Sequence, residues 1–200
     1  MKNQEEVNPE KSWKELIEQV GDNHAPLGPT LSNGFCRDSY KLMWYAGWFK
    51  FAAKMVGKGG KTLVYDPLEG LGGWIVAKEA GDVLAVLEDK DSIDSVRSAW
   101  PDEKITFLQG ILNAGDNEFS GMVCFDIDSQ MNKAGWNDFF KQAGRCVIEG
   151  GVVVAGGMSE GLGGLLKEEA SRKFENIFVF GKGQPHPCIS PADAVVIVAC

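Results

Sequence analysis

The stretch KTLVYDPLEGLGGWIVAKEAGDVLAVLED, residues 61–89, decides the fold that this sequence predicts. It opens with a short apolar run at 61–66 and passes through a glycine-rich turn. A segment with helical character follows at 72–80 and is closed by Gly81, and a second apolar run occupies 83–89. Strand, helix and strand in this order form a β-α-β unit, and the two strands of such a unit lie parallel in one sheet.

Downstream of this unit the alternation continues. Further strands are predicted at 105–110, 121–127 and 151–155, and helices at 91–100, 136–146 and 165–174. The first of these helices is stopped by Pro101, which cannot continue a helix. The pattern extends the parallel sheet to five strands.

The end of the chain departs from this alternation. Two apolar runs, NIFVFG at 176–181 and AVVIVAC at 194–200, are joined by a segment without helical periodicity. Strands joined without a crossover helix pair antiparallel. The predicted fold is therefore α/β and Rossmann-like, a doubly wound, mostly parallel seven-stranded sheet with a C-terminal antiparallel strand pair.

Upstream of residue 61 the sequence predicts two helices. Ser12-Trp13-Lys14-Glu15 is a capping-box pattern that opens a short helix ending at Gly21, and residues 22–35 read as a loop. A longer helix follows at 38–55 with an aromatic stripe at helical spacing, formed by Tyr40, Trp44, Trp48 and Phe51. We expect residues 1–36 to form an N-terminal extension and residues 37–200 to form the α/β domain.

Composition excludes several classes of partner. Asp and Glu outnumber Lys and Arg 28 to 20, for a formal net charge of −8, which disfavours nucleic acid because its binding needs basic side chains. No apolar run is long enough to cross a bilayer, and the polar N-terminus does not resemble a signal peptide. The odd number of cysteines, five without C-x-x-C spacing, favours a reducing cytoplasm.

The order of elements resembles the class I S-adenosylmethionine-dependent methyltransferases. The resemblance covers about residues 37–200 and is greatest to small bacterial enzymes of sugar and polysaccharide pathways. It rests on YAGWFKFAAKMVGKG at 45–59, on the IVAKEAG helix, and on the closing pair NIFVFG and AVVIVAC. The resemblance implies S-adenosylmethionine as cofactor and a small molecule, such as a sugar or sugar nucleotide, as methyl acceptor.

The cofactor motifs of that family are degenerate in this chain. The family carries an acid and a G-x-G-x-G loop after the first strand, and counting back from the following helix places Val64 at the acid and Leu68 at a glycine. Only Gly70 and Gly72 remain. The ribose-binding acid after the second strand aligns with Leu87, and the adenine-binding Asp after the third strand aligns with Gly110.

A shift of the alignment by one or two residues gives a different result, because Asp66 and Glu88 then take the acidic roles. After the fourth strand, Ser129 and Gln130 replace the family's Glu-His pair, and Asp126 is retained. The candidate cofactor-binding residues are Asp66, Glu69, Gly70, Gly72, Glu88, Asp89 and Asp126.

Each candidate also has a structural interpretation. The glycines at 70 and 72 serve tight packing of strand against helix equally well, Asp89 suits a helix cap, and Asp126 suits a surface turn. The aromatic stripe is typical of a core or interface face, with a lid over a cofactor as the alternative. His24 and His186 are the only histidines; we predict no metal site and identify no general base.

Two functions follow from this sequence. The first is a divergent methyltransferase acting on a small molecule. The second is a catalytically inactive pseudo-methyltransferase that serves as a binding or partner subunit, pairing with an active methyltransferase or forming an oligomer through the aromatic helix at 40–55. A bound dinucleotide is a weaker third hypothesis, because no G-x-G-x-x-G is present.

Overall fold

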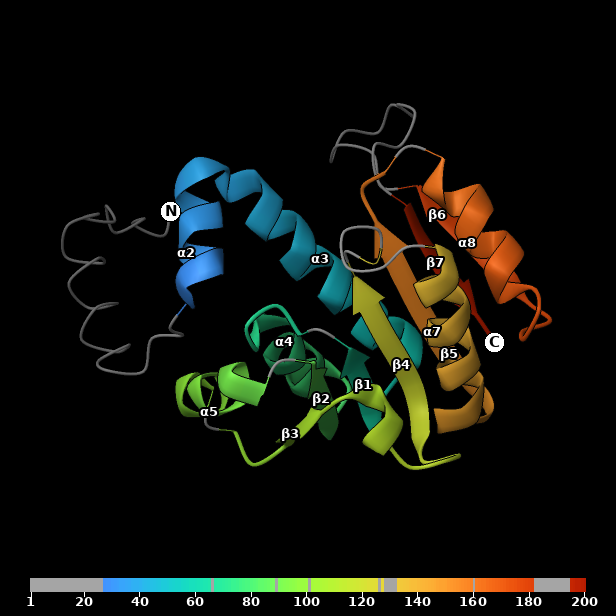
Figure 1. The fold of residues 1–200 in the computed structure, drawn as a ribbon, viewed down its shortest axis with the longest axis horizontal. Helices are drawn as coiled ribbons and strands as arrows, with labels where there is room; N and C mark the ends of the chain where they lie inside the picture. Colours follow the sequence, from blue (N-terminus) through green and yellow to red (C-terminus); the bar gives the residue numbers. More distant parts are fainter. Residues whose placement is uncertain are drawn as a thin grey trace, which may run out of the picture.

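A computed structural model describes residues 27–65, 67–88, 90–100, 102–125, 127, 133–159, 161–181 and 195–200. Its centre is a seven-stranded sheet of order β3-β2-β1-β4-β5-β7-β6 (Figure 1). The strands are β1 (Thr62–Tyr65), β2 (Val83–Leu87), β3 (Ile105–Gln109), β4 (Phe119–Phe125), β5 (Val147–Gly157), β6 (Ile177–Gly181) and β7 (Val195–Ala199). The first five pair parallel, whereas β7 is antiparallel to both β5 and β6. The predicted fold class, including the terminal antiparallel pair, is confirmed.

Helices cover both faces of the sheet. They are α2 (Pro29–Arg37), α3 (Ser39–Val56), α4 (Leu71–Glu79), α5 (Lys90–Ala99), α7 (Lys133–Cys146) and α8 (Leu162–Ala170), with a short 3-10 helix η1 (Ile111–Asn113) after β3. In Figure 1, α7 and α8 lie together on one side of the sheet, and α3, α4 and α5 lie on the other. This arrangement is the doubly wound plan that the β-α-β alternation predicts.

The central strands β1, β2 and β4 are buried on both faces, and their successive residues contribute to two separate cores, whereas the edge strand β6 is largely exposed. Val64 packs in the core beneath α3, α4 and α5, whereas its neighbour Leu63 packs in the core beneath α7 and α8. The same alternation divides Ala85 from Leu84 in β2. A central parallel strand must bury both faces, so its sequence reads as a continuous apolar run.

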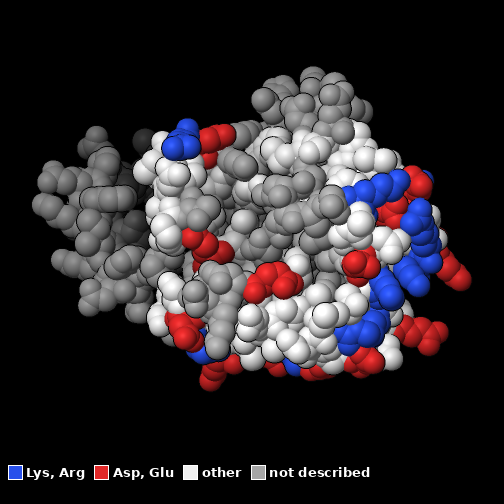
Figure 2. Space-filling model, in the orientation of Figure 1, with Lys and Arg blue, Asp and Glu red and all other residues white. Residues whose placement is uncertain are grey.

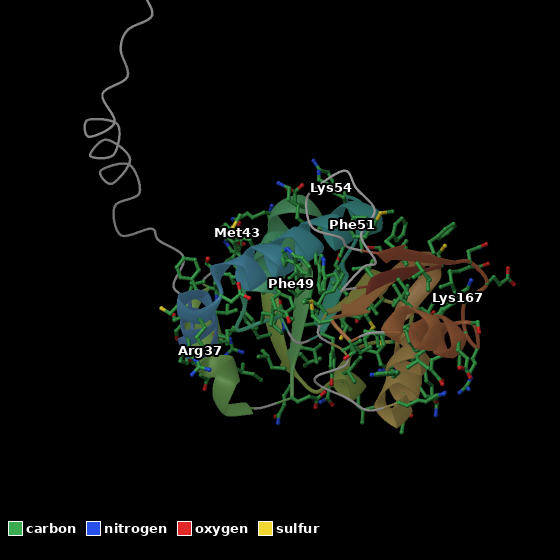
Figure 3. All side chains as sticks on the ribbon, turned by 90° about the horizontal axis from the view of Figure 1, so that it is seen from above. Arg37, Met43, Phe49, Phe51, Lys54 and Lys167 are labelled. Carbon is green, nitrogen blue, oxygen red and sulfur yellow. The ribbon has the colours of Figure 1, made fainter. Side chains whose placement is uncertain are left out.

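Helix α3 is anchored by aromatic contacts with the middle of the sheet. Trp48 and Phe49 are almost fully buried, and their rings lie 5.3 and 5.0 Å from the ring of Phe125 in β4. Figure 3 shows Phe49 below α3, between the helix and the sheet, and Phe51 on the side of the helix that faces β6 and β7. The core interpretation of the aromatic stripe is therefore correct for Trp48.

One predicted element was wrong. Residues 22–35 were expected to be a loop, yet Pro29–Arg37 forms α2. Pro29 occupies the first turn, where its fixed φ favours a helix and its missing N–H costs nothing. Leu31 is buried, and its backbone N–H donates to a Glu69 carboxylate oxygen at 2.8 Å, so contacts distant in sequence complete this helix.

Other differences concern element ends. Strand β5 begins at Val147, four residues before the predicted strand, and its pairing with β4 shifts register between Phe119 and Gly121. Helix α8 begins after Gly161, which has a left-handed φ of 73°, and ends at Ala170. The predicted helix at 12–21 lies outside the described residues. Among the helices that are described, none has the length and apolarity to span a bilayer.

Candidate functional site

A cavity of about 630 Å³ opens at the carboxyl ends of β1, β2 and β3. Open α/β sheets bind their ligands at this edge, where loops leave the strands. Its walls come from the strand ends, from the η1 loop and from one side of α7. The lining residues are Tyr65, Glu88, Gln109, Gly110, Ile111, Leu112, Asn113, Gly135, Asp138, Phe139 and Gln142.

Glu88 supplies the acid at the end of β2. It follows Leu87, the last residue of the strand, and its Oε1 accepts a hydrogen bond from the Tyr65 hydroxyl at 2.8 Å. Leu87 instead packs against the core beneath α4 and α5. Successive side chains of a strand point to opposite faces, so only one of the two can face the cavity. Glu88, which takes the acidic position in the shifted alignment, is thus the residue that lines the cavity.

The loop after β3 forms a second wall. Gly110 has a φ of 69°, and a Cβ there would lie 3.8 Å from Glu88 Oε2, so the loop passes close to the carboxylate. The Asn113 amide nitrogen donates to the Gln109 carbonyl at 2.7 Å. Ile111 and Leu112 add apolar surface, and Leu112 is 75% exposed.

The charge of the cavity is negative. Among the described residues that line it, Glu88 and Asp138 are charged, and none is Lys or Arg. Figure 2 shows Lys and Arg gathered along the side of the molecule formed by α7 and α8, whereas Asp and Glu are scattered over the whole view. The cavity therefore suits a neutral or cationic ligand with hydroxyl groups, and disfavours a phosphate.

The glycine-rich segment after β1, residues 68–72, packs against other parts of the protein and is absent from the described lining of the cavity. A Cβ added to Gly70 would overlap the indole of Trp100, and one added to Gly72 would overlap the ring of Phe49. Both glycines are buried, and the Trp100 indole N–H donates to the Glu69 carbonyl oxygen at 2.6 Å. The rings of Trp100 and Phe49 thus leave no room for side chains at 70 and 72, a packing role that differs from the predicted contact of strand against helix.

Three successive residues of this loop adopt positive φ. The values are 48° at Leu68, 50° at Glu69 and 94° at Gly70. The backbone keeps a conformation that favours glycine, although two of the three residues carry side chains. The Glu69 carboxylate is directed to α2, where it binds the backbone N–H of Leu31 and lies close to Gly28.

Three predicted site residues, Asp66, Asp89 and Asp126, lie outside the described residues. The same holds for Ser129, Gln130, His24 and His186. These residues remain predictions, as does the expectation of no metal site. Of the remaining candidates, Glu88 lines the cavity. Glu69 and Gly70 belong to the loop after β1 and Gly72 to the first turn of α4, and together they pack against Phe49, Trp100 and α2.

Several lining residues were missed by the sequence reasoning. Tyr65 stands next to Asp66 at the end of β1, and Gln109 ends β3 beside Gly110, so the rule that ligands bind at carboxyl strand ends would have found both. Asp138 and Gln142 are spaced four residues apart on α7 and share one helix face. Nothing local marks that face as one that lines a cavity.

Sequence comparison finds no matching family model and no matching curated protein. Solved structures do match. A TehB-like SAM-dependent methyltransferase from Corynebacterium glutamicum aligns with a TM-score of 0.60 and 19% identity, over 86% of this chain and 98% of that one. The N-methyltransferase NodS from Bradyrhizobium japonicum, solved with S-adenosyl-L-homocysteine, has a TM-score of 0.60 and 10% identity, over 78% and 85%.

A third similar structure is the complex between the Trm112 methyltransferase activator of Haloferax volcanii and a methyltransferase. It aligns with a TM-score of 0.60 and 9% identity, over 83% of this chain and 95% of that one. At these identities the likeness shows the fold, which is that of class I S-adenosylmethionine-dependent methyltransferases. Chemistry must be argued from the site itself.

Proposed function

We propose that this chain is a divergent class I S-adenosylmethionine-dependent methyltransferase that acts on a small molecule. The observation that supports it best is the Glu88 carboxylate, which faces the cavity from the carboxyl end of β2 in a methyltransferase-type sheet. An acid in this place can accept hydrogen bonds from both hydroxyls of a ribose. Charge-assisted bonds of this kind contribute roughly 1.5–3 kcal/mol each.

The remaining lining residues fit an adenosyl group. Tyr65 donates to Glu88 Oε1 and so orients the carboxylate, while Oε2 lies on the side of Gly110. Ile111, Leu112 and Phe139 offer apolar surface to the faces of a purine. The lack of basic residues among the described lining disfavours a dinucleotide, whose phosphates need cationic or backbone N–H partners.

S-adenosylmethionine supplies an electrophilic methyl group bonded to a sulfonium. The contribution of this chain is to bind the cofactor, orient it and exclude water, since proximity and orientation account for much of the barrier reduction in such transfers. Glu88 would hold the ribose, and the η1 loop and α7 would flank the base. Asp66, Asp89 and Asp126 are proposed for the rest of the cofactor, and the general base is unassigned.

The acceptor that we propose is a hydroxylated small molecule such as a sugar; the alternative, a sugar nucleotide, would have to bind its phosphates outside the cavity, because no Lys or Arg is among the described lining residues. The resemblance to small bacterial enzymes of sugar pathways supports this class. The net charge of −8 argues against a nucleic acid acceptor.

Calorimetric titration with S-adenosylhomocysteine tests the proposal. We expect wild-type protein to bind, and Glu88→Gln to weaken the affinity by roughly tenfold or more, because one charge-assisted acceptor is lost. Glu103→Gln, which removes an exposed carboxylate from the turn before β3, is the matched control and should bind as wild type does. No heat from wild-type protein at millimolar ligand would end the proposal.

A second function, the inactive pseudo-methyltransferase, is favoured by one observation. The glycine loop, which in an active enzyme approaches the cofactor, here packs against Trp100 and Phe49, and its acid binds α2. Such a protein would act as a partner or binding subunit. Co-purification of a methyltransferase from the native host, together with absent S-adenosylhomocysteine binding, would favour this function over the first.

A further inference from the structure

Arg145, near the end of α7, lies behind the wall of the candidate cavity and contacts two parts of that wall. Its Nε donates to Gln142 Oε1 at 2.8 Å. One terminal nitrogen, NH1, donates to the Ala114 carbonyl at 2.8 Å and to the Asp116 carboxylate, and the other, NH2, donates to the Ile111 carbonyl at 3.3 Å. Gln142 and Ile111 line the cavity, whereas Arg145 itself does not.

The first contact determines which end of the Gln142 side chain faces the ligand. A guanidinium only donates, so the Gln142 atom that it binds must be the acceptor oxygen. The amide N–H₂ group is then the end left for the cavity. In a cavity whose charged groups are carboxylates, this amide supplies a hydrogen-bond donor.

The other contacts fix the η1 loop. Arg145 reaches two backbone carbonyls three residues apart, at Ile111 and Ala114, through two different nitrogens of its planar fork, whereas a Lys ammonium would have to reach both from a single nitrogen. The last turn of α7 adds two backbone bonds: Asn117 N–H donates to the Arg145 carbonyl and Glu118 N–H donates to the Cys146 carbonyl, each at 2.9 Å. The loop is held from the side away from the cavity.

We propose that Arg145 is a positioning residue for ligand binding. Its contacts form a clamp, which holds the η1 loop in place and directs the Gln142 amide toward the ligand. The clamp consists of Arg145, Gln142, Ile111, Ala114 and Asp116. This inference rests on the proposed function, because the ligand is the one proposed for the cavity. In this proposal Arg145 touches no ligand. It affects ligand affinity and selectivity indirectly, because its contacts hold the binding residues in a fixed position.

Hydrogen exchange of the full-length protein without ligand tests the clamp. In Arg145→Lys, the amides of residues 111–117 should exchange at least roughly tenfold faster, while those of β1 and β4 should not change, because the loss is local. Lys141→Gln, which removes an exposed charge from the same helix, is the control and should leave exchange unchanged. Unaltered exchange at 111–117, or a uniform rise across the sheet, would overturn the clamp.

Calorimetry with S-adenosylhomocysteine tests positioning. We expect roughly tenfold weaker binding for Arg145→Lys. Gln142→Glu separates the two roles, because the new carboxylate still accepts from Arg145 but offers no donor: exchange at 111–117 should stay as in wild type while affinity falls. The positioning role would be refuted if Arg145→Lys exchanged its 111–117 amides faster but bound S-adenosylhomocysteine as wild type does. It would also be refuted if Gln142→Glu kept the wild-type affinity.

The two proposals fail in different ways. If the wild-type protein binds no S-adenosylhomocysteine, both the proposed function and the role of Arg145 in positioning that ligand are rejected. The clamp on the η1 loop is then decided by exchange alone, which needs no ligand.

Discussion

The carboxyl ends of β1 and β2 lie side by side in the sheet, yet the chain uses them in different ways. After β2, Glu88 extends into a cavity of about 630 Å³. After β1, the glycine loop is filled by protein: Trp100 covers Gly70, Phe49 covers Gly72, and the Glu69 carboxylate binds α2. Two neighbouring strand ends that are each followed by an acid thus differ: one opens into a cavity and the other is packed against protein.

A glycine in a strand-to-helix turn therefore indicates that another group lies close to the backbone, but it does not show whether that group is a ligand or a part of the protein. At Gly70 and Gly72 the approaching groups are aromatic rings that belong to α5's terminus and to α3. An acid is equally ambiguous, since both Glu69 and Glu88 follow a strand of the sheet, yet Glu69 binds α2 and Glu88 lines the cavity. The comparison predicts that changes in the loop alter stability, whereas changes at the cavity alter ligand affinity.

The largest effect on stability is expected from Gly72→Ala. The added methyl would overlap the ring of Phe49, which is fully buried, so the free energy of unfolding should fall by about 2–3 kcal/mol. Urea denaturation measures the loss. The control is Gly164→Ala in α8, where a Cβ meets nothing within 4 Å; it should leave stability unchanged or raise it by up to about 1 kcal/mol.

Adding Phe49→Leu to Gly72→Ala sharpens this test. If the overlap with the ring causes the loss, the double variant should be more stable than the sum of the two single changes by about 1 kcal/mol or more. Wild-type stability in Gly72→Ala would mean that Gly72 is not packed against Phe49, and the contrast between the two strand ends would be lost.

A smaller effect is expected from Glu69→Ala. The carboxylate accepts from Leu31 N–H in the first turn of α2, where a negative charge also complements the helix dipole, so its removal should cost about 1 kcal/mol. Faster amide exchange in α2 and a lower urea midpoint would show it, with exposed Glu175→Ala as control. Affinity for S-adenosylhomocysteine should change less than about twofold; a larger drop would place Glu69 at the ligand.

The smallest effect is expected from Leu68→Gly. Glycine relieves the positive φ of 48° at the cost of some apolar contact, so the two terms, each about 1 kcal/mol, should nearly cancel. Because Leu68 packs against the core, calorimetry should show an affinity for S-adenosylhomocysteine close to that of wild type. A clear gain in affinity would show that Leu68 obstructs the ligand and that the loop is a degraded part of the site.

Much of the fold could be predicted from local signals. Apolar runs separated by helical segments predicted the parallel strands, and the lack of a helical sequence pattern between the last two apolar runs predicted the antiparallel pair. Helix α2 was missed because its apolar contact and its capping acid lie elsewhere: Leu31 is buried by the tertiary structure, and Glu69 is 38 residues away from it in sequence. Only Pro29 carried a local signal.

The candidate site was predictable in kind but not in register. The sequence placed acids after β1, β2 and β4, yet it could not decide between Leu87 and Glu88, because a shift of one residue exchanges the two faces of a strand. The sequence could not predict that residues of α7, such as Asp138, Gln142 and Arg145, lie at or next to the cavity. Their role depends on how α7 packs beside the η1 loop, and their spacing alone is that of any exposed helix.

By itself the sequence determined where the strands and helices fall along the chain and which strands run parallel or antiparallel, because hydrophobic periodicity and the kind of connection are local properties. The order of the strands within the sheet came from the structure. Only the tertiary structure decided that Phe49 and Trp100 fill the glycine turn, that Glu88 faces a cavity, and that Arg145 supports its wall. These outcomes depend on steric contact and hydrogen bonding between residues far apart in the chain. A local sequence pattern does not specify which distant side chain will contact a given residue.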